Sequence, residues 1–94
     1  MSTKQIPEPF VSRPWRTGDG PRPRVTTWPY GKGPVLAVWS HGKWRDATVQ
    51  ARQDWADGTV HYQVEVDLRG DRNASTRMYR WPQPGLRAMR QPRG

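Results

Sequence analysis

The stretch VLAVWSHGKWRDATVQARQDWADGTVHYQVEV, residues 35–66, decides the fold of this chain. It opens with the apolar run 35–39, whose length fits a short strand that is buried on both faces. A glycine turn at residues 40–43 ends the run, and apolar and polar residues then alternate as far as Arg52. Alternation with a period of two is typical of a strand with one buried face.

The two strands that follow the first turn have matching apolar faces. Asp57 and Gly58 form a tight-turn signal between them. The apolar positions are Ala47, Val49 and Ala51 before the turn and Val60, Tyr62, Val64 and Val66 after it. We therefore predict an all-β domain in which four or five antiparallel strands within residues 35–89 form a small barrel, with no helix longer than about two turns.

The segments on either side complete the predicted organisation. Residues 25–30, VTTWPY, are a candidate edge strand that ends at Pro29. Residues 75–81, STRMYRW, are a candidate fourth strand, and Leu86 and Met89 seal the barrel in a short last element. The domain is thus expected to span residues 25–90, followed by a disordered tail at 91–94.

Residues 1–24 differ in composition from the rest. They contain five prolines together with Gly18 and Gly20, so neither a helix nor a paired strand is expected to run far. We predict a disordered, basic arm rich in proline and arginine that folding does not need.

Length and composition narrow the class of protein. A chain of 94 residues with 33% hydrophobic content holds one small domain, because a chain this short buries roughly 60% of its unfolded surface. The absence of cysteine excludes disulfides and thiolate zinc sites and favours a reduced, cytoplasmic environment. No apolar run reaches the length of a signal peptide or a membrane span, so we expect a soluble protein without membrane contact.

The net charge of +8 lies mainly outside the predicted barrel. Residues 1–34 carry +4 and residues 84–94 carry +3, whereas residues 35–83 carry only +1. Thirteen of the sixteen cationic residues are arginine. Two explanations stay open for this excess, namely selection for phosphate and stacking contacts, or a GC-rich genome that encodes arginine in place of lysine.

Nothing in the sequence indicates catalysis. His41 and His61 are the only histidines, and the aspartates lie near predicted turns, where aspartate commonly caps the backbone. No spacing among these residues is typical of a metal site, paired acid–base carboxylates or a nucleophile triad. We predict a protein that is not an enzyme and that needs no cofactor and no metal.

The order of the elements from residue 35 to residue 89 resembles a Tudor domain, a small SH3-like barrel. The most specific part is LAVWSHGKWRDATV, an apolar strand ending in Trp-Ser, a glycine turn, an aromatic residue, and then Ala and Val. Tudor domains bind methylated arginine or lysine in an aromatic cage. The resemblance places Trp39 at a cage position, with Trp44 beside a second position that Arg45 occupies. The turn at residues 68–71 carries no aromatic residue, so the implied cage is incomplete.

Two functions remain, both of them those of a small binding module. The first is nucleic-acid binding, with arginines on phosphates and barrel aromatics on bases. The predicted phosphate contacts are Arg13, Arg16, Arg69, Arg72, Arg77, Arg80, Arg87 and Arg90. The second is a protein adaptor that holds an extended or modified peptide in an aromatic groove. The aromatic residues predicted to bind in either case are Trp39, Trp44, Trp55, Tyr62 and Trp81, and Trp55 is expected to be exposed in its loop.

Overall fold

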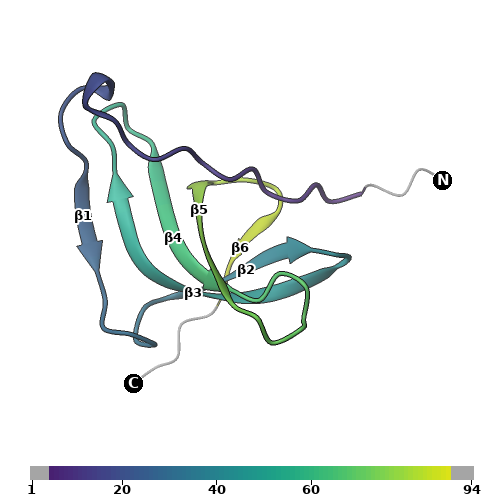
Figure 1. Ribbon diagram of the computed structural model, residues 1–94. Coiled ribbons are helices and arrows are strands. Elements are labelled where there is room, and N and C mark those ends of the chain that lie inside the picture. The colour runs from purple at the N-terminus through teal and green to yellow at the C-terminus, as the bar shows by residue number, and fades with distance from the viewer. Residues whose placement is uncertain (1–4, 90–94) are drawn as a thin grey trace.

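The computed structural model describes residues 5–89, which form an antiparallel sheet of six strands and a single turn of 3₁₀ helix (Figure 1). The elements are η1 (Thr17–Asp19), β1 (Arg24–Thr27), β2 (Val35–Ser40), β3 (Lys43–Asp54), β4 (Val60–Val66), β5 (Ser75–Trp81) and β6 (Leu86–Ala88). The predictions of an all-β chain and of antiparallel strands are confirmed. Within the described residues no helix is long and apolar enough to cross a membrane.

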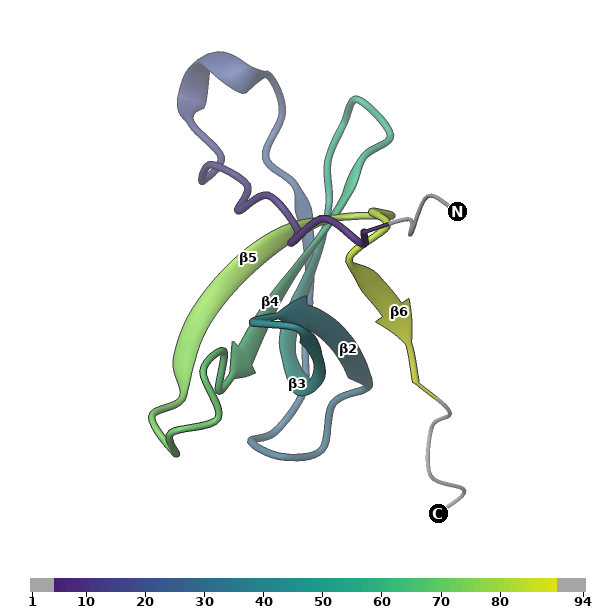
Figure 2. The ribbon, with the colours of Figure 1, turned by 90° about the vertical axis from the view of Figure 1, so that its right-hand side faces the viewer.

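The long strand β3 organises the sheet. Its first half pairs with β2 and its second half with β1 along one edge, while β4 pairs along the other edge. The hydrogen-bonded order is β5-β4-β3-β2-β6, with β1 attached to β3. Figures 1 and 2 show how strongly β3 bends, so that the sheet curves, with β6 beside β2 at one end and β5 at the other. The sheet is not closed, because β5 and β6 end the order and do not pair with each other in the described part of the chain.

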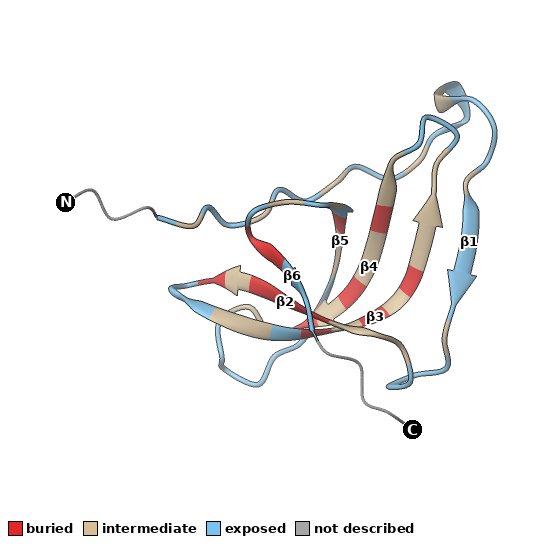
Figure 3. Ribbon diagram, turned by 180° about the vertical axis from the view of Figure 1, so that it is seen from behind, coloured by how far each residue is buried: buried red, intermediate tan, exposed pale blue. Residues whose placement is uncertain are grey.

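The apolar faces of the strands meet inside this bend (Figure 3). The core consists of Leu36, Val38, Ala47, Val49, Val64, Val66, Tyr79 and Leu86. Alternation therefore predicted the inward face of the first half of β3 and of the second half of β4 correctly. It left the inward face of β5 open, and the structure resolves it, because Tyr79 is only 2% exposed whereas Arg80 is exposed.

A β-bulge at Gln50 changes the face of every later residue in β3. The pairing with β4 shifts register between Val49 and Ala51, and an extra residue in one strand turns the following side chains over. Ala51 then lies opposite Gln63, on the face away from the core, although it was expected beside Val49. Arg52 takes the inward face instead, opposite Tyr62.

Residues 7–13 lie against the domain, in contrast to the expected free arm, whereas the loop that carries η1 stands away from the sheet (Figure 2). Val11 forms an antiparallel bridge with Tyr79, and the Ser12 N–H donates to the Met78 carbonyl at 2.8 Å. The same segment packs closely on Gly85, where an added Cβ would lie 2.5 Å from the Pro7 carbonyl oxygen. No α-helix forms in residues 5–24, as the prolines predict, but a bridge of one residue needs only one free N–H and a free strand edge.

His61 links the arm to the sheet. It was expected on the surface, yet it is 5% exposed, with its ring stacked on Trp55 at a centroid distance of 4.0 Å. Its Nδ1 lies 3.1 Å from the Ser12 hydroxyl and its Nε2 lies 3.0 Å from the Thr59 hydroxyl. The prediction that His61 is exposed was wrong. Alternation shows correctly that its side chain points away from the core, but it does not show that the arm and Trp55 cover that outer face of the sheet.

This environment predicts that the protein loses stability in mild acid. Burial lowers the pKa of His61 below its ordinary value, Asp57 opposes the shift, and the charges of Arg80 and Arg13 add to it. Below a pH of about 6.5 the unfolded chain therefore binds the proton before the folded chain does. We expect the melting temperature to fall as the pH is lowered from 7 towards 5.

The matched variant for this prediction is His61→Gln, which keeps a polar side chain and cannot titrate. It is expected to flatten the dependence of melting temperature on pH in this range, measured by circular dichroism. The same slope in both proteins would show that other groups cause it. Asp19 does not contribute to the slope between pH 7 and pH 5, because its hydrogen bonds with Arg13 lower its pKa to about 2.

Candidate functional site

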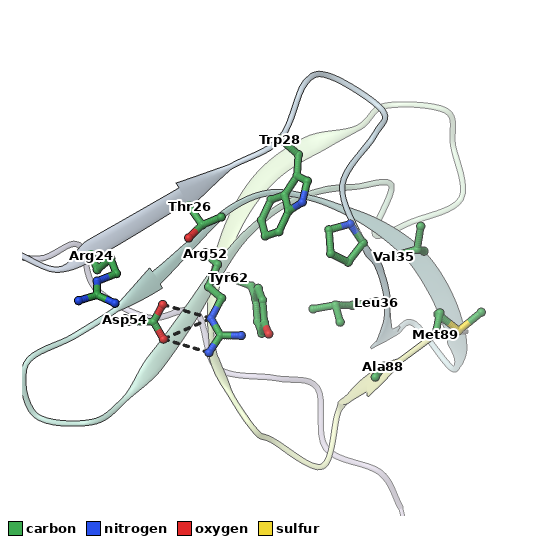
Figure 4. Close-up of a pocket in the computed structure, with 11 residues that line it drawn as sticks. Arg24, Thr26, Trp28, Val35, Leu36, Arg52, Asp54, Tyr62, Ala88 and Met89 are labelled. Atoms are coloured by element: carbon green, nitrogen blue, oxygen red, sulfur yellow. Dashed lines mark hydrogen bonds and ion pairs between the residues drawn. The ribbon is translucent and has the colours of Figure 1, made fainter. Parts of the chain in front are cut away.

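A cavity of about 480 Å³ opens on the concave face, between β1, the second half of β3 and β6 (Figure 4). The side chains that give it its chemistry are Arg24, Trp28, Leu36, Arg52, Asp54 and Tyr62. Its volume lies within the roughly 300–1,000 Å³ that is usual for small-ligand pockets. Cationic, aromatic and aliphatic groups all reach it.

The register of three strands places these side chains on one face. Arg24 lies opposite Asp54, and Thr26 lies opposite Arg52, so both arginines point into the bend. Trp28 follows β1 directly and is tied to β3 by its N–H, which donates to the Gln50 carbonyl at 3.3 Å. The bulge is thus the local cause of the site, because it turns Arg52 inward and its carbonyl holds Trp28.

Asp54 fixes the guanidinium of Arg52. The Nε donates to both carboxylate oxygens at 3.2 Å, and Nη2 donates to Oδ1 at 3.0 Å. The hydrogen bonds with Asp54 raise the pKa of Arg52, which stays cationic. Its carbon Cζ lies 5.9 Å from the centroid of the Tyr62 ring. Three of its five N–H groups are left for other partners.

Arg24 supplies a second, less constrained cation at the rim. It is exposed, and among residues 5–89 only Arg13–Asp19 and Arg52–Asp54 form ion pairs within 4.0 Å. With one aspartate against two arginines, the cavity carries a net charge of +1. Two rings and two guanidinium groups around one opening suit a planar group that carries an anion.

The arginines predicted from the sequence do not gather in one place. Arg69 and Arg77 line a smaller cavity of about 250 Å³ beside the loop between β4 and β5. Arg72 is exposed in the same loop, where the Asp67 carboxylate accepts its backbone N–H at 2.7 Å. Arg87 lies on the other face, 4.2 Å from the centroid of the Trp44 ring.

The arm and the carboxyl end hold the remaining predicted cations. Arg13 is paired with Asp19 at 2.6 Å and lies 5.6 Å from the centroid of the Trp55 ring. Arg16 is exposed beside η1, and Arg80 is exposed at the far end of β5. Arg90 lies outside the described residues, as do the predicted tail at 91–94 and residues 1–4.

The five predicted aromatics form three separate groups rather than one groove. Trp39 and Trp44 meet edge to face at 5.2 Å, and Tyr62 and Trp81 do so at 6.0 Å. Trp55 stacks on His61 and is half-buried, not exposed in its loop as predicted, and its indole N–H donates to the Gln53 Oε1 at 3.0 Å. Of the five, only Tyr62 reaches the concave cavity.

Sequence reasoning missed three residues of this cavity, Arg24, Trp28 and Arg52. The VTTWPY strand was recognised, but nothing local indicates that it pairs with β3 beyond the bulge. Arg52 sits at an alternation position that normally faces solvent, and only the shifted register turns it inward.

Comparisons with protein-family models, with curated proteins and with solved structures found no significant match to the chain. The resemblance to Tudor domains therefore stays a prediction. Trp39 and Trp44 do lie side by side, but the cation over Trp44 is the chain's own Arg87. Within residues 5–89 no group of three or more His, Asp or Glu side chains is placed to hold a metal.

Proposed function

We propose that this protein is a small, non-catalytic module that binds nucleic acid, with single strands as its preferred ligands. The observation that carries the proposal is the concave cavity, where Arg24 and Arg52 stand beside the rings of Trp28 and Tyr62. The proposal includes the expected relation to SH3-like, Tudor-like barrels. The long, bent β3, paired on both edges, supports that relation.

The geometry favours single strands because their bases present free faces. Stacking a base on an aromatic side chain contributes about 1–3 kcal/mol and tolerates any sequence. Arg52, held by Asp54, offers a fixed fork of donors to a phosphate or a base edge, and the exposed Arg24 adds a second charge. The bases of a duplex are already stacked on one another, so they have no free faces to stack on the aromatic rings of this cavity.

The excess of cations in the cavity ranks nucleic acid above the protein-adaptor alternative. An adaptor for an extended peptide was expected to show a continuous, neutral aromatic groove. The described aromatics form separate pairs instead, and the cavity that contains Tyr62 is positively charged.

The expected result is salt-dependent binding of oligothymidylate that depends on Arg24. Each phosphate contact adds about −0.7 to the slope of log affinity against log salt on single strands, so four or five contacts give a slope of about −2.8 to −3.5. Arg24→Ala should weaken binding and flatten the slope by about 0.7. Fluorescence anisotropy of a labelled ten-nucleotide strand at several salt concentrations measures both quantities.

Arg22→Ala is the matched control, because Arg22 is also exposed, lies two residues away and does not line the cavity. It is expected to change the slope less than Arg24→Ala. Equal losses in the two variants would mean that the cavity is not the binding site. No binding by the unaltered protein near 50 mM salt would overturn the proposed function.

A further inference from the structure

A second cavity, of about 560 Å³, lies between the arm and the ends of β4 and β5. Its principal lining side chains are Phe10, Ser12, Thr59, Arg80, Trp81 and Gln83. No acidic residue lines it, and Arg80 gives it a positive charge. The arm therefore builds one wall of a cavity whose other wall is the sheet.

Phe10 is exposed although its backbone is held. Its N–H donates to the Gln83 Oε1 at 2.9 Å, and the Gln83 Nε2 donates back to the Phe10 carbonyl at 3.1 Å. The side chain of Phe10 nevertheless stays outside, and the residue is 81% exposed. An aromatic ring on a fixed backbone, next to an exposed arginine, is the arrangement that stacks a base and neutralises its phosphate.

One pair of rings separates the two cavities. Tyr62 lines the concave cavity, Trp81 lines the second, and their rings meet edge to face at 6.0 Å. Arg80 projects from the face of β5 opposite to Trp81, so a chain that leaves Arg24 and Arg52 has to cross these two rings and the end of β5 to reach Arg80 and Phe10. Each end of that path thus combines cations with aromatic faces.

We propose that the cavity built by the arm is a second subsite for single-stranded nucleic acid, continuous with the concave cavity across Tyr62 and Trp81. This inference rests on the proposed function. It makes the docked arm part of the binding surface, with Phe10 stacking a base and Arg80 contacting a phosphate.

Phe10→Ala and Arg80→Ala test the second subsite on the full chain, because both residues are exposed and their removal leaves the core intact. With a ten-nucleotide oligothymidylate, Phe10→Ala should weaken binding by roughly 5- to 150-fold at unchanged salt slope, which is the stacking range. Arg80→Ala should flatten the slope by about 0.7. Competition with strands of two to ten nucleotides should show affinity levelling off at a shorter length in both variants.

Tyr30→Ala is the control for Phe10→Ala, because Tyr30 is also 81% exposed and lines neither cavity. It is expected to bind like the unaltered protein. If Phe10→Ala and Arg80→Ala also bind like it while Arg24→Ala binds weakly, the second subsite is wrong and the proposed function stands. If the unaltered protein binds no oligonucleotide, both proposals fail together.

Discussion

Tyr79→Ala is expected to remove most of the protein's stability. The residue is 2% exposed within the core cluster, and truncating a buried aromatic side chain to alanine typically costs about 3–5 kcal/mol. A small domain has roughly 5 kcal/mol in total, at the low end of the usual range. Urea denaturation followed by circular dichroism measures the loss.

Two neighbouring variants separate the ring from other effects. Tyr79→Phe keeps the ring in the core and should cost about 1 kcal/mol or less, since it removes only the hydroxyl. Arg80→Ala changes the next residue on the opposite, exposed side and should stay within about 0.5 kcal/mol. A loss below about 1 kcal/mol for Tyr79→Ala would mean that β5 does not close the core as described.

The sequence predicted the strands well where one face is buried. Val49 and Val64 alternate with polar neighbours, and burying them leaves one arrangement of the two strands around the turn at Asp57. The bulge at Gln50 was not predictable in this way. Ala51 is small enough for either face, so the pattern of residue types continues unchanged across the point where the register shifts. The candidate site follows from that shift, which is why Arg24 and Arg52 were missed.

The arm was misjudged for a different reason. Proline content describes what a segment cannot form by itself, whereas docking depends on what the rest of the chain offers to it. The contact between Phe10 and Gln83 joins residues 73 positions apart, and the β5 edge that receives Val11 exists only once the sheet has formed. Local patterns hold no information about such contacts. The same limit applies to Trp55, whose loop position indicated exposure until His61 and Arg13 were placed beside it.

A chain that begins at Val25 is therefore expected to be clearly less stable than the full chain, in contrast to the dispensable arm predicted from composition. The truncation removes the hydrogen bonds of Phe10 and Ser12 with β5 and its turn, and it uncovers His61. Each hydrogen bond contributes about 0.5–1.5 kcal/mol net. The conformational entropy of ordering the arm offsets much of the sum, since fixing a residue's backbone costs about 1–2 kcal/mol.

We expect a net loss of about 1–2 kcal/mol on this truncation, equivalent to a fall in melting temperature of roughly 4–16 °C for a domain of this size. Gln83→Ala in the full chain is the informative companion, because it releases Phe10 without shortening the protein and should reproduce part of the loss. Phe10→Ala should leave the melting temperature nearly unchanged, since its side chain is exposed. If the truncated chain melts within 2 °C of the full chain, docking of the arm contributes no net stability. The arm is then docked for only part of the time, and the cavity that it forms with the sheet exists only during that time.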